Sequence, residues 1–482
     1  MIRFLTYLFL LIPSLVGYAS TKTKYPGGQQ FIFRLTLADK QGGNYRLEHP
    51  TRWLSQKSVE RRRRQGLPLD STDLPVSPHY LRTIQGHRGV SIVGKSRWNN
   101  TVVVHTADST IIDSLRRLPF VKRAQLVWLS PDSIDKHTPK TPYHEYFNAW
   151  DSVPHEYYGG GKEQIETLHG QRLHSIGMRG RGMTIAVLDG GFQNVNRIPA
   201  FLYVRIAGTH DFVWHNPRTV AYEQGDNQPY YETDHGTKVL SAMAVSMPEV
   251  LVGTAPEARY WLLRCEDQQT EQPVEEDYWA MAAEFADSVG VDIINSSLGY
   301  NEYDAPHPCI RLNDLDGETS LISHTASLLA AKGIILVNSA GNTGMSPWKK
   351  ICVPADAHDI LTVGALSPQG RNASFSAVGP TQDGRIKPDV MAIGSPATLI
   401  SGRGSIVRDM GTSFSTPIVC GLVACLWQSL PNKSAFDIIN LVRRTADNYK
   451  EPNNVYGYGK PNFWRAYMIG HADKEQRIRN EE

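Results

Sequence analysis

From about residue 183 onward, hydrophobic residues fall in short continuous runs, and longer segments of mixed polarity separate these runs. A short apolar run indicates a strand that is buried on both faces, as in a parallel sheet. Such strands, alternating with helical segments, predict an α/β fold with a doubly wound, mostly parallel sheet and helices on both faces. The expected strands are 183–189, 258–264, 291–298, 334–339 and 359–365, and the expected helices are 235–247, 273–288 and 320–331.

The N-terminal part of the chain shows a different order of elements. Its segments follow one another as strand, helix, strand, strand, helix, strand, which is the order of a small ferredoxin-like α+β domain. We therefore expect a separate domain over residues 21–130. Its segments are strands 31–35, 89–93, 100–104 and 121–127, helices 76–85 and 109–118, and a further basic helix over 54–66.

Three segments lie outside these two domains. Residues 1–20 combine one arginine, a short apolar stretch and small residues at the end, which is typical of a secretory signal peptide. We therefore expect a secreted or periplasmic protein and, because no later apolar run is long enough for a membrane span, no membrane insertion. Residues 131–161 are rich in proline and glycine and are predicted to be a linker. The second domain then covers 162–470, and a charged tail follows over 471–482.

Three polar residues of the second domain form a candidate catalytic group. Asp189 ends one apolar run, His235 opens a predicted helix, and Ser413 precedes a long apolar stretch. A serine hydroxyl needs a base that takes its proton, and histidine has a suitable pKa. A buried carboxylate on the other ring nitrogen fixes the tautomer of that histidine. The three residues therefore predict a Ser413 nucleophile, a His235 base and an Asp189 acid.

The local context of each residue supports these roles. Asp189 would lie at the carboxyl end of a parallel strand, where open α/β sheets place their sites. Asp234 is a rival for the acid, but it directly precedes His235, and such neighbours do not face each other on a helix. Ser413 would begin a buried helix, whose free amides favour a developing oxyanion. Pro417 would then fall in the first turn of that helix.

The order Asp, His, Ser and the motifs TIAVLDGGF, DHGTKVLSAMA and GTSFSTPIVCG resemble the subtilisin-like serine peptidase family. The resemblance implies a secreted endopeptidase that works through an acyl-enzyme. It also implies that Asn342, in an Ala-Gly-Asn turn after a strand, donates to the oxyanion together with the backbone N–H of Ser413.

Ser297, Leu298 and Gly299 resemble the substrate-binding edge of this family, where an extended peptide adds a strand. A plain core strand is the alternative interpretation of this segment. Tyr300 follows at a position where the family often has a small residue, which leaves the shape of the specificity pocket open.

The first domain resembles, in Ile111 to Val127, the inhibitor-type propeptide that precedes subtilisin-like catalytic domains. The resemblance implies a folding aid that becomes an inhibitor after cleavage within or close to the linker. An accessory domain that is never cleaved is the alternative. The run from Arg61 to Arg64 is either a processing site or, as we prefer, a solvated helix face.

Five cysteines in an exported chain raise the question of disulfide bonds. Cys309 and Cys352 lie at matching distances beyond two strands that we expect to be neighbours, so we predict a disulfide between them. Cys420 and Cys425 point in different directions on one helix and are expected to be buried free thiols. Cys265 is also expected to be unpaired.

Composition and residue spacing mainly exclude possible partners and cofactors. The net charge of +2 gives no electrostatic reason to expect nucleic acid. No Cys/His spacing resembles a zinc site, so no metal ligand is assigned. Structural calcium is frequent in the family, yet the acidic loops Glu223–Asp234 and Asn313–Glu318 lack a specific pattern. We therefore expect no cofactor, with calcium left open, and a monomer whose partners are protein or peptide substrates and its own propeptide.

Two other functions are weighed against the peptidase. A non-catalytic or self-processing protein that binds or acts as a scaffold, with its first domain retained in the cleft, is favoured by the long N-terminal region and by the unusual pair Gly190-Gly191. An esterase of the α/β-hydrolase fold is disfavoured, because that fold orders its triad Ser, Asp/Glu, His and places the serine in Gly-x-Ser-x-Gly. Ser413 stands instead in Thr-Ser-Phe.

Overall fold

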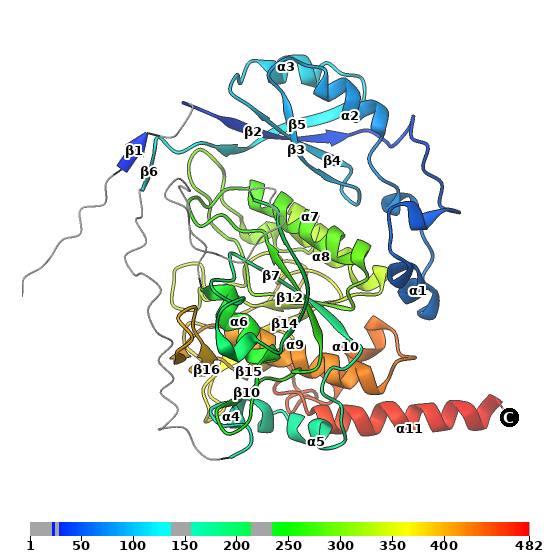
Figure 1. Cartoon of the computed structure of the whole chain (residues 1–482), viewed down its shortest axis with the longest axis vertical. Coiled ribbons are helices and arrows are strands. Elements are labelled where there is room, and N and C mark those ends of the chain that lie inside the picture. The colour runs from blue at the N-terminus through cyan, green and yellow to red at the C-terminus, as the bar shows by residue number, and fades with distance from the viewer. Residues whose placement is uncertain (1–21, 25–27, 136–155, 214–233, 482) are drawn as a thin grey trace, which may run out of the picture.

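The computed structural model describes residues 22–24, 28–135, 156–213 and 234–481. It has a smaller N-terminal part that lies on a larger part, over helices α7 (Val274–Val289) and α8 (Leu321–Leu328), as Figure 1 shows. The predicted signal peptide and residues 136–155 of the predicted linker lie outside the described residues.

The larger sheet is parallel throughout, with the strand order β15-β14-β13-β12-β7-β11-β8. The apolar runs of the sequence predict its inner strands. They do not predict edge strand β8, because its residues are polar and mostly half-exposed, nor β15, whose apolar run is short. The strands are β7 (Thr184–Asp189), β8 (Arg205–Asp211), β11 (Arg259–Arg264), β12 (Ile293–Ser296), β13 (Ile335–Ser339), β14 (Leu361–Leu366) and β15 (Val390–Ile393).

Helices cover both faces of this sheet. Helices α6, α9 and α10 build the apolar core on one face, which includes Val419, and α7 and α8 build the core on the other face, which includes Trp279. The predicted doubly wound α/β fold is confirmed. Besides α7 and α8, the helices are α4 (Lys162–Glu166), α5 (Gly170–Ser175), α6 (His235–Ala244), α9 (Thr412–Ser429), α10 (Ala435–Arg444) and α11 (Phe463–Glu481), the last of which extends into the predicted tail.

The smaller sheet is antiparallel, with the strand order β3-β4-β2-β5. Its first and third strands along the chain lie in the centre, which is the ferredoxin-like arrangement that the sequence predicts. Helix α1 (Gln56–Arg64) is an addition to this arrangement and stands apart from the sheet, beside the larger part (Figure 1). The other elements are β2 (Phe31–Leu37), α2 (Pro78–Gln85), β3 (Ser91–Ser96), β4 (Thr101–Thr106), α3 (Ile111–Arg116) and β5 (Val121–Leu129).

The two faces of the smaller sheet have different neighbours. Helices α2 and α3 cover one face and enclose a core that includes Leu35 and Ile84. The other face packs on α7, where Ile32 and Trp98 share a core with Met281. One hydrophobic core therefore crosses the boundary between the two parts.

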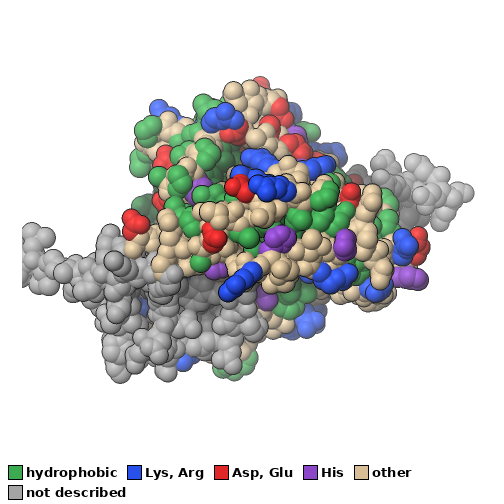
Figure 2. Space-filling model, turned by 90° about the horizontal axis from the view of Figure 1, so that it is seen from above, with side chains coloured by type: hydrophobic (Ala, Val, Ile, Leu, Met, Phe, Trp, Pro, Cys, Tyr) green, Lys and Arg blue, Asp and Glu red, His purple; other side chains and the backbone are tan. Residues whose placement is uncertain are grey.

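Seen from above, the outer surface of the molecule shows lysine and arginine side chains among acidic and hydrophobic ones (Figure 2).

Three two-stranded sheets complete the described strands. The paired strands are β1 (Lys22–Lys24) with β6 (Ser133–Asp135), β9 (Ser246–Met247) with β10 (Leu251–Val252), and β16 (Ala397–Ile400) with β17 (Ile406–Asp409).

None of the described helices is both long and apolar enough to cross a membrane.

The arginine run on α1 differs from the prediction of a solvated helix face. Arg63 and Arg64 are exposed, as expected, but Arg61 and Arg62 are each only 2% exposed. The prediction is wrong for these two because their side of α1 faces the larger part, where Asp287 accepts hydrogen bonds from both guanidinium groups.

Candidate active site

Asp189 ends β7, an inner strand of the parallel sheet. Its side chain is fully buried, and its Oδ1 accepts a hydrogen bond from the backbone N–H of Gly190 at 2.8 Å. In a parallel sheet the carboxyl ends of all strands meet at one edge, so the residues that follow β12 and β13 lie at the same edge as Asp189.

His235 is the first residue of α6. Its Nδ1 lies 2.9 Å from Oδ1 and 3.0 Å from Oδ2 of Asp189. Glycine is required at the next position, because a Cβ on Gly236 would lie 2.3 Å from the carbonyl oxygen of Gly191. Asp234 is hydrogen-bonded elsewhere. The structure therefore pairs His235 with Asp189 and not with its chain neighbour.

Ser413 is the second residue of α9 and is buried. Its hydroxyl donates a hydrogen bond to the carbonyl oxygen of Ser297 at 3.4 Å. The ring of the next residue, Phe414, lies 5.7 Å from the ring of His235 between centroids. The first turn of α9 is therefore next to the first turn of α6, and the three predicted residues come together at one edge of the sheet.

The prediction that Pro417 lies in the first turn of its helix is wrong, because Pro417 is the sixth residue of α9. Proline lacks the N–H that would bond the carbonyl four residues earlier, which is that of Ser413. The Ser413 carbonyl instead accepts a hydrogen bond from Oγ of Ser297 at 2.9 Å. The loop after β12 therefore replaces the missing helical bond and holds the backbone of Ser413.

Asn342 lies in the turn after β13 and is exposed. Its side-chain oxygen accepts hydrogen bonds from the N–H and the hydroxyl of Thr412, both at 2.9 Å. Because the oxygen faces Thr412, the amide nitrogen, which is the donor of this group, faces away from it. Thr412, the residue before Ser413, thus fixes the direction in which the amide donor of Asn342 points.

The segment after β12 combines buried side chains with one exposed glycine. Ser297 and Leu298 are buried, and Gly299 is exposed. Tyr300, which the sequence marks as unusual, is 1% exposed and belongs to the core. The structure brings Ser297 against Ser413 and leaves Gly299 as the open part of the predicted substrate edge.

The charges around His235 favour its protonated form. Burial lowers the pKa of His235, but the charge and hydrogen bond of Asp189 and the charge of Glu266 outweigh it and raise the pKa to about 9. Burial and the charge of Asp189 raise the pKa of Glu266 to about 7. The neutral imidazole that a general base requires is therefore favoured as the pH rises.

Glu266 is a site residue that the sequence analysis missed. It lies two residues beyond β11, whose last residue, Arg264, is paired in register with Asp189. Its Oε2 would lie 2.9 Å from a Cβ on Gly190, which shows how closely it approaches the turn after Asp189. The signal that identified Asp189, a polar residue at the end of a predicted strand, also applies to Glu266.

The predicted disulfide between Cys309 and Cys352 is wrong, because all five cysteines are free. Strands β12 and β13 are neighbours, as expected. However, Sγ of Cys309 lies 3.9 Å from the carbonyl oxygen of Tyr303, and Sγ of Cys352 lies 3.6 Å from Oδ1 of Asn301. Adjacent strands do not determine where residues far along their following loops lie. Cys420 and Cys425 are buried free thiols, and Cys265 is unpaired, as predicted.

Within the described ranges, no group of three or more His, Cys, Asp or Glu residues is placed to hold a metal ion. In the loop Asn313–Glu318, the carboxylate of Asp316 accepts hydrogen bonds from the backbone N–H groups of Glu318 and Thr319. Most of the loop Glu223–Asp234 lies outside the described residues.

Comparison with known families agrees with both parts of the fold. The subtilase family model matches residues 180–459, which is more than half of the chain. The model of the peptidase S8 propeptide domain of Bacteroidota matches residues 33–142. The chain therefore belongs to the subtilase family. It is a subtilisin-like serine endopeptidase that is made as a precursor, with a propeptide domain before its catalytic domain.

Individual relatives show the same similarity. The chain is 29% identical over 315 residues to the serine protease AprX of Bacillus subtilis (strain 168), covering 59% of this chain and 66% of that protein. It is 26% identical over 320 residues to subtilisin NAT of Bacillus subtilis subsp. natto, covering 66% and 74%. The solved structure of MycP1 with its N-terminal propeptide removed matches 63% of this chain and 96% of that chain, at 24% identity and a TM-score of 0.49.

Proposed function

We propose that this chain is a secreted serine endopeptidase whose catalytic triad is Ser413, His235 and Asp189. The observation that carries the proposal is the hydrogen bond between Nδ1 of His235 and the buried carboxylate of Asp189, made beside the first turn of α9. This bond leaves Nε2 as the ring nitrogen that serves the Ser413 hydroxyl.

The chemistry follows from these positions. Oγ of Ser413 attacks the peptide carbonyl while Nε2 of His235 takes the hydroxyl proton. The C–N bond then breaks, and the imidazolium gives its proton to the leaving amine. A water molecule, activated by the same nitrogen, hydrolyses the acyl-enzyme and restores Ser413. Asp189 fixes the tautomer of His235 and stabilises its charged form throughout.

Two further groups assist this reaction in the proposal. The backbone N–H of Ser413 and the side-chain amide of Asn342 donate hydrogen bonds to the tetrahedral oxyanion. The orientation of Asn342 by Thr412 supports this role. The substrate lies extended along Ser297 to Gly299 and adds a strand there.

We propose that the precursor matures by self-cleavage after export. Ser413 cuts the chain within or close to residues 131–161 and separates the propeptide domain from the catalytic domain. The test is the intact mass of the exported chain, with the wild type beside Ser413→Ala. We expect the wild type alone to lose an N-terminal fragment that ends near residues 130–161. A wild type that keeps its full length apart from the signal peptide would contradict self-cleavage.

A second candidate is a binding or scaffold protein that retains its propeptide domain. The buried ion pair between Arg34 and Asp277, at 2.6 Å across the domain boundary, favours retention. Incubation of the purified chain with an unfolded protein distinguishes the two functions. Cleavage by the wild type and not by Ser413→Ala supports the peptidase, whereas identical inactivity of both supports the scaffold.

A further inference from the structure

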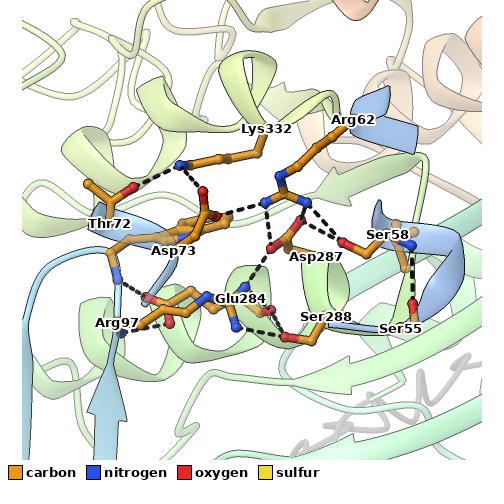
Figure 3. A network of polar contacts seen from close by, with 12 residues as sticks. Ser55, Ser58, Arg62, Thr72, Asp73, Arg97, Glu284, Asp287, Ser288 and Lys332 are labelled. Atoms are coloured by element: carbon orange, nitrogen blue, oxygen red, sulfur yellow. Dashed lines mark hydrogen bonds and ion pairs between the residues drawn. The ribbon is translucent and has the colours of Figure 1, made fainter. Parts of the chain in front are cut away.

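The propeptide domain contacts the catalytic domain in two chemically different regions. Its sheet packs on α7 through apolar side chains. Helix α1 and the short 3-10 helix Ser71–Asp73 instead reach the C-terminal end of α7, where polar contacts dominate (Figure 3). Helix α7 ends at Val289 and β12 begins at Ile293, so this end of α7 lies at the amino edge of the sheet. The polar region is therefore on the opposite edge from His235 and Ser413.

Asp287, in the last turn of α7, is the centre of the polar region, and its side chain is fully buried. Arg62 donates to its two oxygens at 2.8 and 3.0 Å, and Arg97 donates at 2.5 Å. Arg61 also pairs with Asp287, and it donates to the carbonyl of Val291 at 2.6 Å. The three arginines belong to the propeptide domain. Although burial opposes it, their charges hold the pKa of the Asp287 carboxyl well below its usual range.

Lys332 contributes a buried charge from the catalytic side. Its ammonium is hydrogen-bonded to Oγ1 of Thr72 at 2.7 Å and to Oδ2 of Asp73 at 3.1 Å. Asp73 also accepts a hydrogen bond from Arg62 at 2.9 Å. Both domains therefore supply cations and carboxylates, and each buried charge meets an opposite charge. We call Arg61, Arg62, Arg97, Asp287, Asp73 and Lys332 the arginine clamp.

We propose that the arginine clamp is a docking site for the propeptide domain that is separate from the cleft, and that it keeps this domain bound after the linker is cut. Its occupant is the chain's own segment 55–73, together with Arg97. Cutting within 131–161 breaks none of its contacts, because no clamp residue lies in that segment. The inference rests on the proposed function only in assuming that the linker is cleaved.

The reason for slow release is physical. Separating the domains must break several buried charge contacts before water can reach these groups, and buried hydrogen-bonded charge pairs of this kind slow dissociation. Guanidinium groups stay protonated, so the three arginines of the clamp keep their positive charge.

The test separates docking from catalysis. The full chain carries Ser413→Ala and a recognition site for a sequence-specific protease inserted within residues 136–155. The chain is folded intact, cut, and followed by size-exclusion chromatography and by the rate at which the two fragments separate. We expect the fragments to co-elute. The double variant Arg61→Met/Arg62→Met should separate roughly 100-fold faster, as for the loss of a buried ionic partner.

The same helix provides the matched control. Arg63→Met/Arg64→Met changes two exposed arginines and should separate at the parental rate. Lys332→Met leaves α1 unchanged and should separate roughly tenfold faster, so it tests the clamp if the first variant does not fold. Parental fragments that separate on cutting, or equal rates for the two arginine pairs, would overturn the proposal. Because every chain carries Ser413→Ala, these results do not depend on whether the wild type cleaves itself.

Discussion

Asp189 and Asp287 are both fully buried carboxylates, and they differ in what they face. Asp189 faces the imidazole of His235 at the carboxyl edge of the sheet, and Asp287 faces three guanidinium groups at the amino edge. An imidazole gains and loses a proton near neutral pH, whereas a guanidinium does not. The first carboxylate is therefore suited to supporting proton transfer by the imidazole, and the second is suited to holding two domains together.

The two places also differ in their access to solvent. The side chain of His235 is 32% exposed, whereas the three arginines around Asp287 are at most 11% exposed. A substrate can reach the first pair, and water is excluded from the second. The partner and its surroundings, rather than the acid itself, decide what a buried carboxylate does.

The largest expected effect comes from neutralising the first acid. Asp189→Asn should lower kcat by about 10⁴-fold, the size usual for triad carboxylates, because the imidazolium loses its counter-charge and tautomer control. The melting temperature should change little, since the two side chains have the same shape. Peptide hydrolysis at alkaline pH, with calorimetry of the same sample, checks both points. A fall in kcat of less than tenfold would contradict the role of Asp189.

Neutralising the second acid should give the opposite result. Asp287→Asn should destabilise the Ser413→Ala precursor by about 3–5 kcal/mol, because buried guanidinium groups lose their counter-charge. Urea unfolding measures this loss. In a chain that keeps Ser413, the mature enzyme should retain its kcat, since Asp287 lies at the other edge of the sheet. Unchanged precursor stability would mean that the clamp contributes nothing.

A smaller effect is expected from the bond that replaces the missing helical bond at Pro417. Ser297→Ala leaves the Ser413 carbonyl without the hydroxyl that now bonds it and should reduce the free energy of unfolding by about 1–3 kcal/mol. The control is Ser429→Ala, whose hydroxyl bonds the carbonyl of Leu426 within its own helix. Urea denaturation of both variants in the Ser413→Ala background compares them. Equal losses would argue against a special role for Ser297.

The smallest expected effect concerns pH. The pKa of His235 is raised to about 9, so kcat/KM should rise with pH and its acid limb should lie above pH 6.5. Glu266→Gln removes a negative charge that favours the imidazolium, so the limb should move to lower pH and kcat/KM at pH 7 should rise by less than about tenfold. Glu451→Gln, at an exposed glutamate, serves as the control. A limb that moves to higher pH would show that Glu266 does not act through His235.

Part of the site could be predicted because its residues follow apolar runs. Asp189 ends β7 and Asn342 follows shortly after β13, and a parallel sheet brings strand ends to one edge. Glu266 obeys the same rule but stands two residues beyond its strand, outside any motif. The bond from Ser297 to the Ser413 carbonyl was not predictable from the sequence. A proline in the first turn, as the sequence indicates, would leave no helical carbonyl without a partner.

The disulfide that was predicted but does not form also shows what the sequence cannot predict. The neighbouring positions of β12 and β13 were predicted correctly, since both are apolar runs in a βαβ order. The paths of the loops that carry Cys309 and Cys352 depend on packing against residues such as Tyr303 and Gly341. Such packing leaves no periodic pattern in the sequence, so the sequence does not predict it.

The sequence alone therefore determined the two fold classes, the inner strands and the order of the acid, base and nucleophile. These features depend on patterns within single elements, where apolar periodicity and turn residues act locally. Only the tertiary structure decided that Arg61 and Arg62 are buried and that the cysteines remain free. Arg62 meets a carboxylate 225 residues away. A charge run has the same local pattern whether water or a distant acid faces it, so its role is settled only when the two domains pack together.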